Sequence, residues 1–151
     1  MSRQKEETQS YFSTNAGEWH ASAQSQNEKK LNSLKQRYDC VLAEADQIGT
    51  VKTFLDLGCG SGEMSILMAE RGTRCKGIDF AEEMIEIATR TANENNVGDL
   101  CTFETGSVLE IDLANEPYDM VAALGLIEYL SIEDTKNLFK RVNDCLKDKG
   151  A

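Results

Sequence analysis

A glycine-rich turn follows a short apolar run in the stretch FLDLGCGSGEMS, residues 54–65. Its glycines, Gly58, Gly60 and Gly62, lie at alternate positions, so three side chains are absent from one short piece of backbone. The apolar run has the length of a buried strand, and helical spacing follows the turn. Such a turn presents backbone N–H groups and the positive end of a helix dipole to whatever lies above it. We therefore expect a ligand to bind close to this backbone.

Two kinds of phosphate site use a turn of this type, and the residues here differ from both. A dinucleotide site needs G-x-G-x-x-G, but the position of its third glycine holds Glu63, whose carboxylate repels a pyrophosphate. A P-loop needs a Lys-Ser or Lys-Thr pair after the glycines, and this sequence has none there. Two further carboxylates, Asp56 and Asp79, end the first and second apolar runs, where ligands of open α/β folds bind. An adenosine that carries a cation suits these surroundings, and Asp79 is placed to accept hydrogen bonds from both ribose hydroxyls.

The elements around this turn alternate between two patterns. Short apolar runs lie within residues 52–58, 74–80, 100–105 and 118–125, and segments of helical spacing separate them. This alternation is typical of βαβ units, hence of a parallel sheet of four strands with helices on both faces. A helix over 31–48 should end at Gly49, and Ser131 with Asp134 forms a capping box for a last helix that Gly150 ends. Its buried stripe is expected to be Leu138, Phe139, Val142 and Leu146.

Composition restricts the partners of the chain. Sixteen Lys and Arg against 26 Asp and Glu give a net charge of -10, which repels a phosphate backbone and argues against nucleic acid. No apolar run approaches the roughly 18 residues of a membrane span, and the polar start MSRQKEETQS lacks a signal-peptide core. We expect a cytoplasmic protein that does not bind membranes. The cysteines lie far apart without a C-x-x-C pair, so we expect reduced thiols, no metal site and no disulfide framework; Cys59 is a small residue in a tight turn or a reactive nucleophile.

Two stretches, LDLGCGSGEMS (55–65) and GIDFAEEMIEIA (77–88), together resemble the class I S-adenosylmethionine-dependent methyltransferases. The resemblance continues in FETGSVLEID, YDMVAALGLIEYL and KRVNDCLKDKG, and covers residues 50–150. It implies a Rossmann-like, doubly wound and mostly parallel sheet, of which the order 3-2-1-4 would be present and the fifth strand would not. Residues 1–49 would then be a helical lead or lid segment, and residues 50–151 the cofactor-binding core of the same domain. A missing C-terminal segment or a second copy of the chain is expected to cover the edge of the fourth strand.

The resemblance also implies a role for individual residues. Asp56 would help to hold the amino group of the cofactor, Asp79 would bind the ribose, and Phe80 and Met84 would border the adenine. Ser107 occupies a place where many relatives have an aspartate for the adenine amino group. Leu124, Gly125 and Leu126 would lie beside the sulfonium and the acceptor. The residues expected at the cofactor are Asp56, Gly58, Cys59, Gly60, Gly62, Asp79, Phe80, Met84, Ser107, Val108 and Leu124.

The function that this resemblance implies is methyl transfer from S-adenosylmethionine, with S-adenosylhomocysteine as product, to a small-molecule acceptor. Such a transfer is an in-line displacement, which needs alignment of the nucleophile with the methyl group and exclusion of water more than it needs catalytic side chains. The candidates for a base are His20, Glu128 and Tyr129; an oxygen acceptor needs one, whereas an amine needs only to arrive neutral. Two alternatives stay open: a cofactor-binding module without activity of its own, and a Rossmann-type dinucleotide enzyme, which Glu63 disfavours.

Overall fold

The structure is a computed structural model that describes residues 3–23, 28–113 and 116–148. Three helices precede the sheet, and a helix follows each of the first two strands. The helical segment predicted between the third and fourth strands is not found among the described residues, where the third strand leads to the fourth without a helix. The lead helices are α1 (Arg3–Thr14), α2 (Ala16–Ala23) and α3 (Glu28–Ile48). The elements that follow are β1 (Thr53–Leu57), α4 (Glu63–Glu70), β2 (Arg74–Asp79), α5 (Glu82–Glu94), η1 (Gly98–Leu100), β3 (Cys101–Thr105), β4 (Met120–Ala122), η2 (Ile127–Tyr129) and α6 (Ile132–Cys145).

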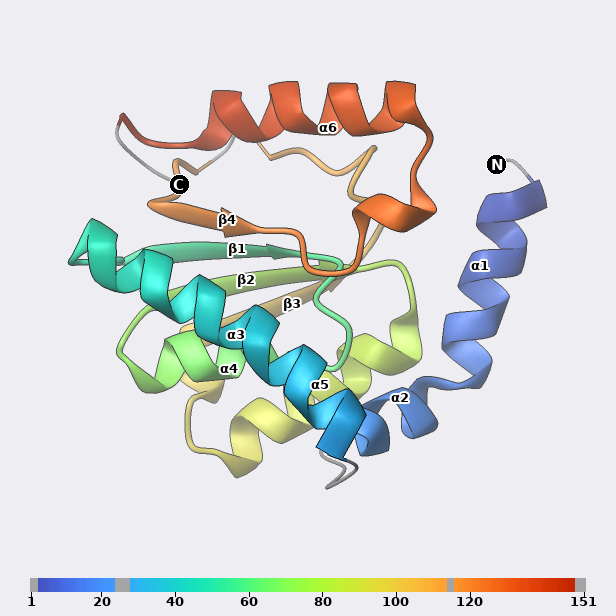
Figure 1. Cartoon of the computed structure of the whole chain (residues 1–151), viewed down its shortest axis with the longest axis horizontal. Helices are drawn as coiled ribbons and strands as arrows, with labels where there is room; N and C mark the ends of the chain where they lie inside the picture. Colours follow the sequence, from blue (N-terminus) through green and yellow to red (C-terminus); the bar gives the residue numbers. More distant parts are fainter. Residues whose placement is uncertain (1–2, 24–27, 114–115, 149–151) are drawn as a thin grey trace.

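The four strands form one sheet of order β3-β2-β1-β4, and every neighbouring pair is parallel. This confirms the predicted fold class and the order 3-2-1-4. Because all strands run in one direction, their carboxyl ends meet at a single edge of the sheet, which faces the side where α1 and α2 lie (Figure 1). Functional side chains at strand ends are therefore brought together there.

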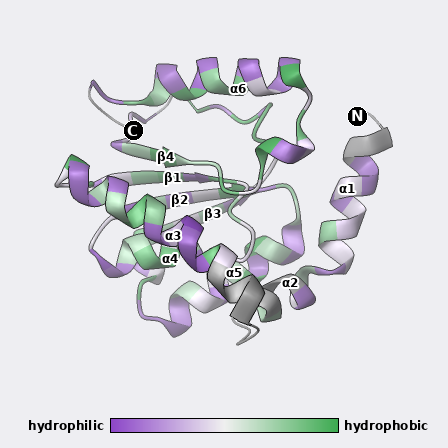
Figure 2. Cartoon of the chain, in the orientation of Figure 1, coloured by the Kyte–Doolittle hydropathy of each residue, from purple (hydrophilic) through white to green (hydrophobic). Residues whose placement is uncertain are grey.

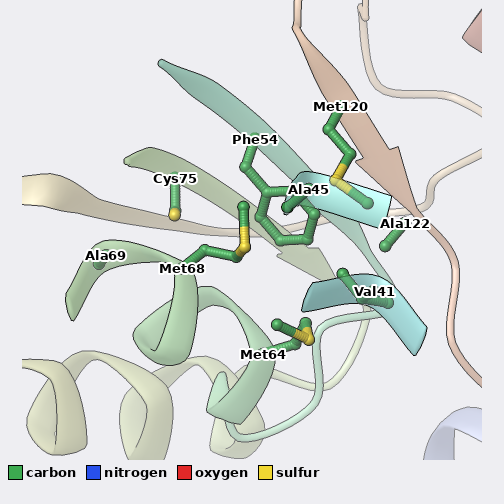
Figure 3. Close-up of a cluster of buried hydrophobic side chains, with 9 residues drawn as sticks. All are labelled: Val41, Ala45, Phe54, Met64, Met68, Ala69, Cys75, Met120 and Ala122. Atoms are coloured by element: carbon green, nitrogen blue, oxygen red, sulfur yellow. The ribbon is translucent and has the colours of Figure 1, made fainter. Parts of the chain in front are cut away.

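Helices cover both faces of the sheet: α3 and α4 lie against one face and α6 against the other (Figure 1). The alternation of side chains along β1 explains both layers, since Phe54 packs with Met68 and Met120 while Leu55 packs with Leu138 of α6. Figure 3 shows the first of these clusters, which also includes Val41 of α3. Figure 2 shows that β1 and β4 are largely hydrophobic whereas the helices combine both kinds of residue, as expected of elements with one buried face.

Phe103 of β3 packs over two glycines. A β carbon on Gly77 would lie 2.6 Å from Phe103 Cδ1, and one on Gly62 would lie 2.9 Å from Phe103 Cζ and 2.9 Å from Ala88 Cβ. All three distances are far below ordinary contact, so the ring needs the space that these glycines leave. Gly62 thus allows the start of α4 to approach α5 and β3.

The last helix differs in detail from the prediction. Ser131 is the N-cap, as predicted, because the Asp134 N–H donates to Ser131 Oγ at 3.0 Å. Phe139 was predicted to be buried, but it is 59% exposed. Leu138 and Cys145, which are seven residues apart, are the buried residues of this helix, and a side chain next to Leu138 points about 100° away from it. The helix also ends at Cys145, before Gly150, which lies outside the described residues.

The chain after α6 turns alongside β4. The Tyr118 N–H donates to the Cys145 carbonyl at 2.8 Å and the Lys147 N–H donates to the Tyr118 carbonyl at 2.9 Å. The neighbouring Asp119 N–H bonds Thr53 on β1, so the polar groups of Tyr118 point to the opposite, outer side of the sheet. Among the described residues, Leu146 is the one that pairs with this outer edge, through a single parallel bridge.

Asp119 ties the start of β1 to the end of the described chain. Its Oδ2 accepts from the Lys52 and Thr53 N–H groups at 2.8 and 2.9 Å, and its Oδ1 accepts from Lys147 Nζ at 2.8 Å. Burial alone would raise the pKa of Asp119, but these hydrogen bonds lower it below its usual value.

Within the described ranges, no helix is both long enough and apolar enough to span a bilayer.

Candidate functional site

A cavity of about 460 Å³ opens at the carboxyl ends of β1 and β2, between these strands, the lead helices and the segment after β4. Most of the residues that the sequence singled out line it. They are Asp56, Gly58, Cys59, Gly60, Asp79, Phe80, Met84, Leu124, Glu128 and Tyr129, and Gly125 and Leu126 complete the segment after β4. The topology therefore brings together residues that are more than 70 positions apart in the chain.

The glycine turn forms the floor of this cavity next to β1. The N–H groups of Gly58 and Cys59 both donate to the Ile78 carbonyl, at 2.8 and 3.0 Å, which fixes the turn to β2. Gly58 and Gly60 have φ angles of 71° and 53°, a left-handed conformation that favours glycine. A β carbon on Gly60 would meet nothing within 4 Å, so this part of the turn is open toward the cavity.

Asp79, the last residue of β2, is held by the turn. Its Oδ2 accepts from the Gly60 N–H at 2.9 Å and its Oδ1 from the Ala81 N–H at 2.9 Å. Burial raises the pKa of Asp79, and the backbone hydrogen bonds offset part of that rise. Each carboxylate oxygen has a second lone pair, so a rigid acceptor remains available to a ligand.

Asp56 is the most buried carboxylate of the site, with 2% of its surface exposed. Ser65 Oγ of α4 donates to its Oδ2 at 2.8 Å. Burial raises the pKa of Asp56 to about 7; the Ser65 bond opposes this rise, and the charges of Glu63 and Asp79 add to it. A cation bound nearby would favour the ionised form and lower this pKa again.

Charge is distributed unevenly around the cavity. Asp56, Glu63 and Asp79 gather at the glycine turn, and the charges of Glu63 and Asp79 both act on Asp56. Arg37 of α3 is the one cationic side chain among the described residues that line the cavity. Its Nη1 lies 3.2 Å from where a β carbon of Gly125 would be, so the positive charge is beside the segment after β4. The site is acidic at the turn and has a single cation on another wall.

Cys59 does not have the surroundings of a nucleophile. Its thiol is buried, and burial raises its pKa well above the usual value, with further contributions from Asp56, Asp79 and Glu63. A nucleophilic thiolate requires the opposite environment. The structure thus favours the interpretation of Cys59 as a small residue in a tight turn.

The lead helices close one side of the cavity. Phe12 of α1 makes edge-to-face contacts with Phe80 and Tyr129, with ring centroids 5.9 and 5.3 Å apart, and Gln9 Nε2 donates to the Phe80 carbonyl at 3.1 Å. Met84 is buried in the same cluster. The cavity is also lined by residues of the lead helices that no sequence motif marks, namely Phe12, Ser33, Leu34, Arg37 and Tyr38. Leu34 and Tyr38 lie in the helix predicted over 31–48, and periodicity cannot distinguish a packed residue from one that lines a cavity.

Three expected residues do not line this cavity. Gly62 packs against Phe103. Ser107 Oγ accepts from the Leu109 N–H at 3.3 Å, and Val108 is buried on the α6 side, where Arg141 Nη1 donates to its carbonyl at 2.6 Å. The side chain of His20 is not among those that the structure describes. Nor do the described residues include any group of three metal-ligating side chains.

Comparison with known proteins identifies relatives of most of the chain. Residues 54–150 match a family model described as a methyltransferase domain. The chain is 36% identical over 116 residues to a ubiquinone biosynthesis O-methyltransferase of Neisseria meningitidis, with 74% of this chain and 46% of that protein aligned. It is 29% identical over 133 residues to an O-antigen chain terminator bifunctional methyltransferase/kinase of Escherichia coli, covering 84% of this chain and 18% of that one. The chain thus spans less than half of the length of these two relatives.

A solved structure shares the fold. Magnesium protoporphyrin IX methyltransferase from Synechocystis PCC 6803, crystallised with S-adenosylhomocysteine, superimposes with a TM-score of 0.80 at 23% identity. The match covers 95% of this chain and 68% of that one, so the lead helices belong to the shared architecture as well.

Proposed function

Because this chain belongs to the methyltransferase domain family, we propose that it binds S-adenosylmethionine in the cavity above the glycine turn and transfers the methyl group to a small-molecule acceptor. The observation that carries the proposal is the acidic cluster of Asp56, Glu63 and Asp79 beside a turn that lacks side chains. A phosphate ligand would be repelled by these carboxylates, whereas a cationic one is attracted.

The chemistry of the cavity fits this cofactor. S-adenosylmethionine carries a sulfonium and an ammonium group, one carboxylate and a ribose with two hydroxyls. The acidic cluster provides negative charge for the first two, and Arg37 provides a cation for the carboxylate. The volume of about 460 Å³ also lies in the range of small-molecule pockets.

We assign the parts of the cofactor to residues of this cavity. Asp79, fixed by two backbone N–H groups, would accept hydrogen bonds from the ribose hydroxyls. Asp56 would pair with the ammonium group, and Phe80 with Met84 would border the adenine. Gly58 and Gly60 would allow close approach of the backbone. Ser107 and Val108 are left out of this assignment because they do not line the cavity.

The residues of this chain would act by alignment and by exclusion of water. The cofactor supplies a methyl group on a positively charged sulfur, and its displacement needs an acceptor atom in line with that bond. Leu124, Leu126 and Phe12 provide apolar walls that keep water away. Glu128, which lines the cavity beside Tyr129, would receive a proton from an acceptor that has to lose one.

Binding measurements test the first half of the proposal. Titration calorimetry with S-adenosylmethionine, S-adenosylhomocysteine and NAD should show binding of both adenosyl sulfur compounds and none of NAD. Asp79→Ala should weaken cofactor binding by about 1 to 3 kcal/mol, because a buried hydrogen-bond acceptor is lost. The exposed Asp99→Asn is the matched control. Equal affinity of the Asp79→Ala variant and the unchanged protein would place the ribose elsewhere, and preferential binding of NAD would favour a dinucleotide enzyme.

Turnover separates an enzyme from a binding module. Incubation with methyl-labelled cofactor and a metabolite extract, followed by mass spectrometry, should show label in a small molecule. Cofactor binding without any transfer, by this chain and by a longer form that contains it, would favour the module.

A further inference from the structure

Two cysteines lie side by side at the amino ends of β2 and β3. Cys75 and Cys101 are register partners in the parallel pairing of these strands. Side chains of register partners point to the same face of a sheet, and neighbouring strands are about 4.8 Å apart. That separation falls within the range of about 4.4 to 6.8 Å between α carbons that a disulfide spans. The two thiols are therefore close enough to be bridged with little movement of the backbone.

The two thiols differ in access and in acidity. Cys75 is 2% exposed, while Cys101 lies on the edge strand and is partly exposed. Cys75 has two acceptors within reach, the Thr73 carbonyl at 3.4 Å and the sulfur of Cys101. The hydrogen bond between the two sulfurs, followed by burial, raises the pKa of Cys75, and the same bond lowers that of Cys101. Cys101 is thus the thiol that an oxidant reaches, with Cys75 directly behind it.

The other cysteines lack this combination. Cys59 and Cys145 are buried, and burial raises the pKa of each thiol. Cys40 is exposed on α3, which precedes β2 and β3 in the chain, and it has no register partner in the sheet. All five are free in the structure.

We propose that Cys101 and Cys75 are a peroxide-sensitive thiol pair that oxidises to a disulfide across β2 and β3. The Cys101 thiolate attacks one oxygen of hydrogen peroxide, so the O–O bond breaks, a sulfenic acid forms and, after proton uptake, water leaves. The Cys75 sulfur then attacks the Cys101 sulfur, its proton and the hydroxyl leave as a second water, and the S–S bond forms. Two thiols are oxidised and one peroxide is reduced in the complete reaction.

The bridge would enclose the β2–α5 unit and fasten the edge strand β3 to its neighbour. The loop between the two cysteines contains Asp79, which lies at the opposite end of β2, four residues or about 13 Å from Cys75. We therefore expect a higher resistance to unfolding with little change at the cavity. Closing a loop of this length in a domain of this size should raise the Tm by about 5 to 10 °C.

The experiment oxidises the full chain with a slight excess of hydrogen peroxide, blocks the remaining thiols with iodoacetamide and maps the peptides by mass spectrometry. The expected result is a cross-link between the peptides of Cys75 and Cys101 that a reductant removes, together with the rise in Tm. Cys101→Ser and Cys75→Ser should each abolish both effects, and Cys40→Ser should abolish neither. Calorimetry with S-adenosylhomocysteine should return the same Kd before and after oxidation.

Three results would overturn the proposal. They are retention of both thiols after oxidation, a bridge that includes Cys40 in place of either partner, and oxidation of Cys101 to a sulfinic acid without a bridge. Thermal melts of the reduced variants show whether each one is folded. If a serine variant does not fold, Cys101→Ala or Cys75→Ala is used in its place. If the reduced protein does not bind S-adenosylhomocysteine, the proposed function is refuted. The peptide map still decides, independently of that result, whether the two thiols form a disulfide.

Discussion

Replacement of Asp56 by asparagine should make the protein more stable at neutral and alkaline pH. The side chain is almost completely buried, and its pKa is raised from 3.8 to about 7, chiefly by burial. An asparagine has nearly the same shape, stays neutral at every pH and can still accept a hydrogen bond from the Ser65 hydroxyl group. The variant therefore removes the titration while it preserves the packing.

The sign and size follow from proton linkage. Between pH 4 and pH 7 the unfolded Asp56 is ionised and the folded one is protonated, so the folded state binds more protons and its stability falls as pH rises. Each pH unit in this window costs about 1.4 kcal/mol, so the two units between pH 5 and pH 7 amount to about 3 kcal/mol. Wild type should lose this amount relative to Asp56→Asn between pH 5 and pH 8.

Urea unfolding of both proteins at pH 5 and pH 8, followed by circular dichroism, measures the difference directly. Comparing wild type with the variant at each pH cancels the titration of all other groups, and Asp99→Asn at an exposed position controls for loss of one charge. A free-energy difference that is the same at both pH values would show that Asp56 titrates normally and that the buried-carboxylate argument is wrong.

Three further results are expected. Affinity for S-adenosylmethionine should rise about tenfold between pH 5.5 and pH 7 in calorimetry, because the bound cation favours ionised Asp56, and Asp56→Asn should flatten this dependence. Gly62→Ala should lower the free energy of unfolding in urea by about 2 to 3 kcal/mol, since its β carbon would lie 2.9 Å from the Phe103 ring at a φ of 83°. Gly60→Ala, whose β carbon would meet open space, should lower it by about 1 kcal/mol. Equal losses in the two variants would contradict the packing argument. Asp119→Ala should cost about 2 kcal/mol at pH 7, because two backbone N–H groups at the start of β1 lose their acceptor, and the loss should shrink only as pH falls below about 4, because the lowered pKa keeps the folded carboxylate ionised down to that point. A loss that is already absent at pH 5 would be incompatible with that lowered pKa.

Local patterns predicted the sheet well. The four apolar runs became the four parallel strands, and Gly49 and Gly72 lie in the left-handed conformation expected where helices end. Strand and helix periodicity depend on neighbours in the chain, so a sequence carries them directly. The predicted burial of Phe139 is wrong because the preceding residue, Leu138, faces the sheet, and helical spacing alone allowed either residue to do so.

The three glycines of the turn show a second reason why a prediction can miss the structure. Gly58, Gly60 and Gly62 all lie in the left-handed region, and the sequence indicated that another group approaches the backbone closely at each of them. For Gly60 the space is open toward the cavity, whereas for Gly62 it is filled by Phe103, a residue 41 positions later on β3. A missing side chain is visible in the sequence; the group that takes its place is not.

The sequence by itself determined the acidic glycine turn and hence the kind of ligand it suits, because Asp56, Glu63 and Asp79 lie at or just after strand ends that parallel pairing must bring to one edge. The tertiary structure alone decided that α1 and α3 cross this edge, so that Phe12 and Arg37 complete the cavity while Ser107 and Val108 are directed elsewhere. The physical reason is the range of the interactions. Strand order and turn chemistry are encoded within short segments, but which helix covers an open sheet edge depends on packing between residues distant in the chain.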